Sequence, residues 1–312
     1  MVQPGKLPAI HRPGRVPVRE ILTPAKIRNK AEELLNSDRS NLRNVVLEML
    51  YEFVILSEAS LFRLAFERVA ISDNPASFHR RLNDYAREGL IERVSRRVLK
   101  QALRAGLPRP ENGILRAYRL GPVGEELARI KFVREVNAPL SAIEAEEYQA
   151  HDLLCAEAML KMQTLWHEHP DEKLRGIVEV HGPRKLTLWD SVEQKAILAP
   201  NGLIVKHNLN GDFVRAFLIE YHNSNARMHV ENKVAKYEAL ADPKYNWLWQ
   251  AWELSEMPYI AVLYRQGATL EHYLDVLGQT ARGRGVQAVY AGVPLASVWA
   301  GELSIKAIRY QG

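Results

Sequence analysis

Three polar residues in the C-terminal half have types and spacing that could support metal-assisted chemistry. Pro200 and Asn201 precede the apolar stretch "GLIVK", and Glu220 and His222 bracket Tyr221 at the end of "FLIEYH". Because alternate residues of a strand face the same side, we expect Glu220 and His222 to project together. Many DNA-cutting enzymes hold a metal with an acid after proline on one strand and Glu-x-Lys on the next. Here an amide replaces that acid and an imidazole replaces the lysine.

These replacements weaken the expected metal chemistry. Magnesium-assisted phosphodiester hydrolysis needs hard oxygen ligands and a group that activates water. The amide of Asn201 is a neutral ligand, and the imidazole of His222 prefers softer metals. Asn201, Glu220 and His222 therefore predict a degenerate catalytic site with no resident metal, or with Mg²⁺ if the site is active. Lys233 and Lys236, on a following helix, could replace the missing lysine. The acids that could compensate for the missing carboxylate are Glu157, Glu179, Asp190 and Glu231.

Positive charge is concentrated in one segment of the chain. The 312 residues carry a formal net charge of +5, and residues 76–131 hold thirteen Lys or Arg against six Asp or Glu. That segment contributes +7, so the remainder of the chain sums to −2. Such a concentration is typical of a surface that binds a polyanion, although a solvated face with chance clustering remains an alternative.

The basic segment lies within a pattern typical of a winged helix. Helical periodicity over 42–53 is followed by a short helix capped by Ser57 and a third helix that begins at Asp73 or Asn74 and ends at Gly89. Residues 90–99 and 114–122 alternate as two short strands of a wing. In winged helices the third helix enters the major groove and the wing contacts phosphates or the minor groove. The residues expected to face DNA are Ser77, His79, Arg80, Arg81 and Asn83 on the helix and Arg93, Arg96, Arg97, Lys100 and Arg104 on the wing. The alternative is a winged helix that binds protein.

Composition shifts divide the chain into three parts. Residues 1–38 are predicted to be a basic, proline-rich arm, 39–135 a winged-helix DNA-binding domain, and 136–312 an α/β domain, with a linker over 132–150. The third part follows the order α-β-β-β-α-β-α-β, which favours a three-layer α/β arrangement. The segment 297–310 is predicted to begin as a strand.

Several classes of function are excluded by composition. The single cysteine, Cys155, lies in an apolar helical stretch and rules out an internal disulfide or a cysteine-rich zinc site. No apolar run approaches the roughly 18 residues of a membrane span, and no signal peptide is evident at the N-terminus. We therefore expect a cytoplasmic protein with no membrane partner. Nucleotide-binding loops and serine-hydrolase motifs are not found.

The chain resembles the plasmid replication-relaxation family, described among mobilisation-type proteins of mobile elements. The resemblance covers about residues 40–295 and rests on "LSEASLFRLAF", "YRLGPVGEELAR", "EYQAHDLLCAEAML", "LAPNGLIVK", "FLIEYHNSN" and "ENKVAKYEAL" in this order. In that family the corresponding places usually read Pro-Asp, Glu-x-Asp and a Lys-x-x-x-Tyr helix. Pro200–Asn201, Glu220-x-His222 and Lys233-x-x-x-Tyr237 match in part, which puts nicking activity in doubt.

The resemblance implies an α/β (α+β multidomain) protein. An N-terminal winged helix-turn-helix would precede a three-layer α/β/α domain of the PD-(D/E)XK-nuclease-like type. The leading hypothesis is a DNA-binding protein that assists replication, relaxation or mobilisation, with an inactive nuclease-like domain. Its partners would be double-stranded DNA and other replication or mobilisation proteins, and a homodimer is compatible with this layout. The alternatives are a metal-dependent endonuclease or nickase, and a transcription regulator or protein adaptor.

Overall fold

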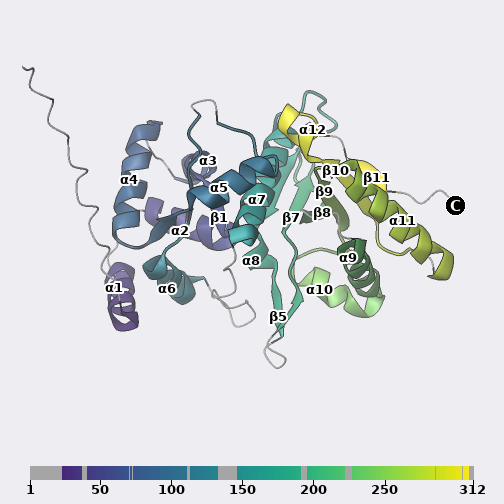
Figure 1. Ribbon diagram of the computed structural model, residues 1–312, viewed down its shortest axis with the longest axis horizontal. Helices are drawn as coiled ribbons and strands as arrows, with labels where there is room; N and C mark the ends of the chain where they lie inside the picture. Colours follow the sequence, from purple (N-terminus) through teal and green to yellow (C-terminus); the bar gives the residue numbers. More distant parts are fainter. Residues whose placement is uncertain are drawn as a thin grey trace, which may run out of the picture.

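The computed structural model describes residues 23–36, 41–69, 71, 73–110, 113–132, 146–190, 195–221, 227–284, 286–303 and 305–308. It shows a mixed α/β protein with a small three-stranded sheet in the N-terminal half and a larger six-stranded sheet in the C-terminal half (Figure 1). Within the described residues, none of the helices combines the length and apolar character required to cross a bilayer.

The N-terminal half consists of helices arranged around the antiparallel sheet β1-β3-β2. Its elements are α1 (Pro24–Asn36), α2 (Asn41–Phe53), β1 (Ile55–Ser57), α3 (Glu58–Arg68), α4 (Pro75–Arg87), β2 (Ile91–Arg93), α5 (Arg96–Arg104), β3 (Ala117–Leu120) and α6 (Pro122–Lys131).

Local sequence signals explain where α3 and α4 begin and end. The Ser57 hydroxyl accepts a hydrogen bond from the Ser60 N–H at 3.1 Å, which caps α3. The Asn74 side chain caps α4 in the same way, and Pro75 occupies the first helical position. Gly89, at a φ of +78°, ends α4 in a conformation that side chains disfavour. The predicted boundaries of these two helices are confirmed.

The first strand of the predicted wing is wrong in its second half, whereas the second strand, expected over 114–122, contains β3. The strand expected over 90–99 covers only β2, and Arg96, Arg97, Lys100 and Arg104 lie on helix α5 instead. Ser95 caps this helix through the Val98 N–H at 3.2 Å. Val98 and Ala102 are buried on one side of α5, while the basic residues are exposed on the other side. The β-branched Val94 and Val98 favour a strand locally, but strong helix formers and a cap favour the helix.

Part of the predicted arm is also structured. Residues 24–36 form helix α1, which packs against α6 and buries Ala31. Pro24 stands at the first helical position, and the following residues are mostly good helix formers. The remainder of the predicted arm before residue 23 lies outside the described residues, as does most of the predicted linker.

The C-terminal half is built around the sheet with strand order β11-β10-β9-β8-β7-β4. Its elements are α7 (Glu146–His167), β4 (Ile177–His181), α8 (Pro183–Leu186), β5 (Leu188–Asp190), β6 (Lys195–Leu198), β7 (Gly202–His207), β8 (Phe213–Tyr221), α9 (Arg227–Leu240), the 3₁₀ turn η2 (Pro243–Tyr245), α10 (Asn246–Gln250), β9 (Tyr259–Tyr264), α11 (Gly267–Arg284), β10 (Tyr290–Pro294), α12 (Leu295–Ala300) and β11 (Lys306–Ile308).

Helices cover both faces of the six-stranded sheet. Strands β8, β9 and β10 are parallel, and α9, α10 and α11 pack on one face while α7 and α12 pack on the other (Figure 1). The predicted order of the main helices and strands is confirmed. The strand expected to begin at 297 is wrong, because Leu295–Ala300 forms helix α12, which buries Leu295 and Val298.

One hydrophobic core joins the two halves. A single cluster of buried residues extends from Ala31 in α1 through α2 and α7 to Val298 in α12. Gly182, before α8, fits directly against the end of α2, where a Cβ atom would lie 2.3 Å from the Glu52 carbonyl oxygen. At this point the backbones of the two halves are therefore in direct contact.

Candidate functional site

Glu220 is a buried carboxylate with two donors on α9. Its side chain lies near the end of β8, is 1% exposed, and faces the same side of the sheet as α9. The Lys233 ammonium group bonds to Oε2, and the Tyr237 hydroxyl bonds to Oε1. A helix positioned over the sheet thus supplies a lysine at Glu220, although the strand itself lacks the Glu-x-Lys pattern.

The surroundings of Glu220 alter the proton affinities of neighbouring side chains. Burial raises the pKa of Tyr237 well above its usual value, and the negative charge of Glu220 adds to this effect. Burial lowers the pKa of Lys236, and the positive charge of Lys233 lowers it further. The pKa of the buried Cys155 thiol is raised by burial, then by Asp152 and Glu220. Tyr237 and Cys155 are therefore neutral groups at ordinary pH.

Asn201 continues the pairing of β7 with β8. Its N–H donates to the Ile219 carbonyl at 3.1 Å, and its Oδ1 accepts from the Tyr221 N–H at 2.9 Å. The amide oxygen thereby occupies the place of a backbone carbonyl at the end of the ladder. Asn201 is next to Glu220 across the strand pair, as the spacing predicted, but its amide oxygen already has a structural partner.

The other proposed ligands whose side chains the structure describes bond to partners other than Glu220. His222 lies outside the described residues, as does the Asp190 side chain. Glu157 bonds to Ser57 and Ser60, Glu179 pairs with His181 and His207, and Glu231 pairs with Arg227. In the described ranges of the chain, no group of three or more His, Cys, Asp or Glu side chains could hold a metal ion.

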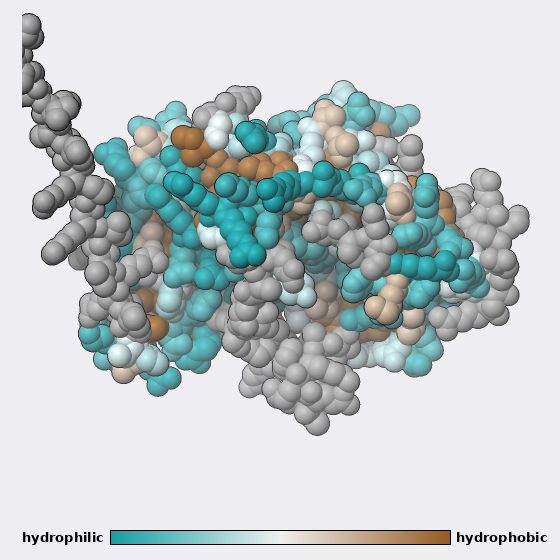
Figure 2. All heavy atoms as spheres, in the orientation of Figure 1, coloured by the Kyte–Doolittle hydropathy of each residue, from teal (hydrophilic) through white to brown (hydrophobic). Residues whose placement is uncertain are grey.

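The predicted DNA-facing residues divide into two sets. Arg80, Arg81, Arg93, Arg96, Arg97, Lys100 and Arg104 are exposed. Figure 2 shows hydrophilic side chains gathered over α5 in the centre of this face. In contrast, His79 pairs with Glu58 at 2.9 Å, and Asn83 accepts a hydrogen bond from Arg93 at 2.5 Å. Ser77, in the first turn of α4, is half-buried.

Helical geometry groups four of these cations. Residues 96, 97, 100 and 104 lie within about 100° of one another around an α-helix of 3.6 residues per turn. They therefore form one face of α5, which we call the α5 basic face. Asn83 of α4 bonds to Arg93 of β2, just before α5, so the exposed cations of α4 and α5 lie in adjoining elements.

A further arginine lies between the α5 basic face and the end of the large sheet. Arg265 directly follows β9, and its Cδ lies 4.0 Å from the position that a Cβ on Gly106, just beyond α5, would take. Its charge lowers the pKa of Tyr221, although burial and then Cys155 dominate and raise that pKa to about 12. Sequence reasoning missed Arg265. Its one signal was a basic residue at the carboxyl end of a parallel strand, where ligands of α/β sheets bind.

No family model, curated protein sequence or solved structure matches this chain.

Proposed function

We propose that this chain is a DNA-binding protein of a plasmid or mobile element that assists replication, relaxation or mobilisation. In this proposal the N-terminal half is a winged helix and the C-terminal half is a nuclease-like domain that binds DNA without robust cleavage. The observation that carries the proposal is the α5 basic face, which is exposed, as are Arg80 and Arg81 of α4. Clustered arginine side chains favour phosphate and guanine contacts because the planar guanidinium can donate two parallel hydrogen bonds.

Three of the exposed cations form no ion pair with the carboxylates that the structure describes. Arg87 pairs with Asp84 on α4 and Arg119 pairs with Glu92, but no ion pair is found for Arg80, Arg81 or Lys100 within the described residues. A phosphate backbone would supply the missing negative charge. Arg265 extends the positive surface toward the end of the large sheet, which favours one DNA molecule that contacts both halves.

The test is a titration of a short fluorescent duplex with the wild-type chain and with the Arg80→Ala, Arg81→Ala double variant. Because each such contact contributes roughly 1–3 kcal/mol, affinity should fall at least about tenfold. A control variant removes two exposed lysines elsewhere, Lys173→Ala with Lys244→Ala, and should bind like the wild type. Unchanged affinity in the α4 variant would instead favour a winged helix that binds protein.

One observation favours a second candidate, a metal-dependent nickase. Lys233 reaches Glu220 from α9, so the lysine missing from the strand is replaced in space. Supercoiled plasmid incubated with Mg²⁺ or Mn²⁺ distinguishes the candidates. Under the first proposal the plasmid stays supercoiled. Nicking by the wild type that is lost in the isosteric Glu220→Gln variant would establish the nickase.

A further inference from the structure

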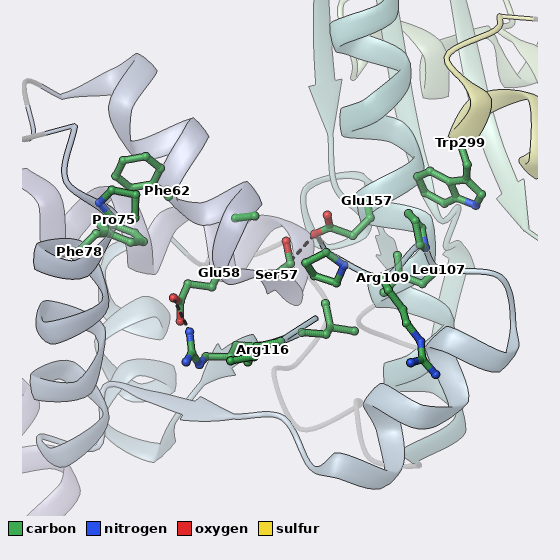
Figure 3. A pocket seen from close by; sticks show the side chains of 15 residues that line it. Ser57, Glu58, Phe62, Pro75, Phe78, Leu107, Arg109, Arg116, Glu157 and Trp299 are labelled. Atoms are coloured by element: carbon green, nitrogen blue, oxygen red, sulfur yellow. Dashed lines mark hydrogen bonds and ion pairs between the residues drawn. The ribbon is translucent and has the colours of Figure 1, made fainter. Parts of the chain in front are cut away.

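A cavity of about 410 Å³ lies where the two halves meet. Phe62 of α3 and Phe78 of α4 line one side, and Leu107, beyond α5, lines another. Glu157 of α7 and Trp299 of α12 come from the C-terminal half (Figure 3). Its volume lies within the roughly 300–1,000 Å³ range of small-molecule sites, and its lining is mainly apolar with a few polar groups, as such sites require.

Glu157 presents a carboxylate without a cationic partner. Its Oε1 accepts from the Ser57 N–H at 2.9 Å and its Oε2 from the Ser60 hydroxyl at 2.8 Å, and both donors are neutral. The nearby Arg63 guanidinium bonds instead to the Thr164 hydroxyl and to the Leu160 carbonyl. Among the described residues no ion pair is found for Glu157.

The other acid of the cavity differs in this respect. The Glu58 carboxylate pairs with Arg116 at 3.3 Å and with His79 at 2.9 Å. It also accepts a hydrogen bond from the Tyr118 hydroxyl at 2.9 Å. Its charge is therefore balanced inside the fold (Figure 3). The unbalanced negative group of this cavity is Glu157.

Aromatic side chains line the cavity at both of its ends. Trp299 of α12 lies at one end, on the other side of Glu157 from Phe62 and Phe78 (Figure 3). The rings of Phe62 and Phe78 lie 5.3 Å apart in an edge-to-face arrangement and offer an aromatic wall on the opposite side.

We propose that this cavity binds a small aromatic amine, with its ammonium group at Glu157 and its ring against the apolar wall. The cation satisfies the unpaired carboxylate, and the ring replaces water against the apolar wall. This binding does not depend on the proposed function. Because α4 contributes Pro75 and Phe78 to the wall, an effect of the ligand on DNA affinity would rest on that function.

Two matched probes test the site by calorimetry with the full chain. Tyramine carries the ammonium group, and tyrosol replaces it with a hydroxyl. Tyramine should bind saturably. Tyrosol should bind several-fold to about tenfold more weakly, because it loses the interaction with the buried carboxylate.

Variants assign the binding to this cavity. Glu157→Gln keeps the side-chain shape and should remove the preference for tyramine over tyrosol. The matched control Glu172→Gln, at an exposed position beyond α7, should leave that preference intact. Ala59→Phe places a ring in the cavity from an exposed position and should block both probes without disturbing buried hydrogen bonds. The proposal is overturned if tyramine does not bind saturably, or if Ala59→Phe binds tyramine like the wild type.

Discussion

The Glu220 carboxylate is both the strongest candidate for chemistry and a structural anion of the fold. Lys233 and Tyr237 each bond to one of its oxygens, and Glu220 itself is almost fully buried. Removing such a carboxylate leaves a cation and a hydroxyl without their acceptor. An activity assay with an alanine variant would therefore confuse lost chemistry with lost folding.

We predict that Glu220→Ala lowers the free energy of unfolding by about 3–5 kcal/mol, because breaking a buried pair leaves the remaining partners without an acceptor. Lys233 is about one-third exposed, so the loss should lie toward the lower end of this range. Urea unfolding measures the difference. Glu231→Ala, which breaks the exposed pair with Arg227, should cost no more than about 1 kcal/mol. Equal losses in both variants would contradict a structural role for Glu220.

Asn201 allows a second prediction about the same strand ends. Asn201→Ala should lower the free energy of unfolding by about 1–3 kcal/mol, because the Tyr221 N–H loses its acceptor. Asn201→Asp keeps an acceptor oxygen and should retain most of this stability. Urea unfolding of the two variants separates lost hydrogen bonding from a change of charge. If Asn201→Asp is as unstable as Asn201→Ala, the amide oxygen is not the stabilising group.

The sequence predicts the placement of these residues better than their bonding. Residue spacing is sufficient to place Asn201 and Glu220 on neighbouring strands, and the pairing of β7 with β8 confirms it. Which donors reach Glu220 depends on how α9 packs over the sheet. The sequence therefore offered Lys233 only as one option, and the family resemblance alone drew attention to Tyr237.

At the scale of elements, two carboxylates form hydrogen bonds between the halves. Their contributions to stability should depend on pH in opposite ways. Glu52 at the end of α2 accepts from the Gly182 N–H at 3.3 Å and lies 3.4 Å from His181 Nδ1. Burial alone would raise its pKa, but the hydrogen bond with His181, the charge of Lys185 and the Gly182 N–H outweigh burial and lower it. For Glu157 burial dominates over its hydrogen bonds with Ser57 and Ser60, and the pKa is raised.

These directions predict different pH profiles of stability. A lowered carboxyl pKa contributes stability above the unfolded value of 4.5 and loses it as the pH falls below that value. A raised pKa makes the fold less stable as the pH rises from 4.5 through the folded pKa. Urea unfolding across pH should therefore show Glu52→Gln most destabilised relative to wild type above pH 4.5. The free energy of unfolding of Glu157→Gln, relative to wild type, should increase as the pH rises. Parallel profiles for the two variants would contradict this assignment.

Helix α5 shows why an element can be misassigned from sequence. Ile91, Val94 and Val98 are β-branched residues that favour a strand, and a winged-helix layout expects a strand there. The signals for a helix were Ser95 as a cap and the spacing of Val98 and Ala102, which are buried four residues apart. A tertiary contact decided the outcome, because that apolar side of α5 packs against α7.

At the scale of the whole molecule, the α5 basic face predicts how DNA affinity depends on salt. Each phosphate bound by a cation contributes about 0.9 to the slope of log affinity against log salt. Replacing Arg96, Lys100 and Arg104 with glutamine should make the slope shallower by up to about this amount for each phosphate that is no longer neutralised. Titration at several salt concentrations measures it, with Lys173→Gln as the exposed control. If the triple variant binds DNA more weakly but with an unchanged salt slope, the phosphates do not contact these three side chains.

The shared core predicts that the two halves unfold together, even though the sequence suggests a boundary near residue 136. Buried residues of α2, β1 and α7 form one cluster with residues of β8 and α12, and Ser57 and Ser60 bond to Glu157 across the junction. All six tryptophans follow residue 165, so their fluorescence reports the C-terminal half, whereas circular dichroism reports helices in both halves. The two signals should give coincident urea transitions, as expected for one cooperative unit. Ser60→Ala, which weakens the junction, should lower both midpoints equally. If it moves the circular-dichroism transition ahead of the tryptophan transition, the halves fold independently, and the contact between them is too weak to hold one DNA molecule across both.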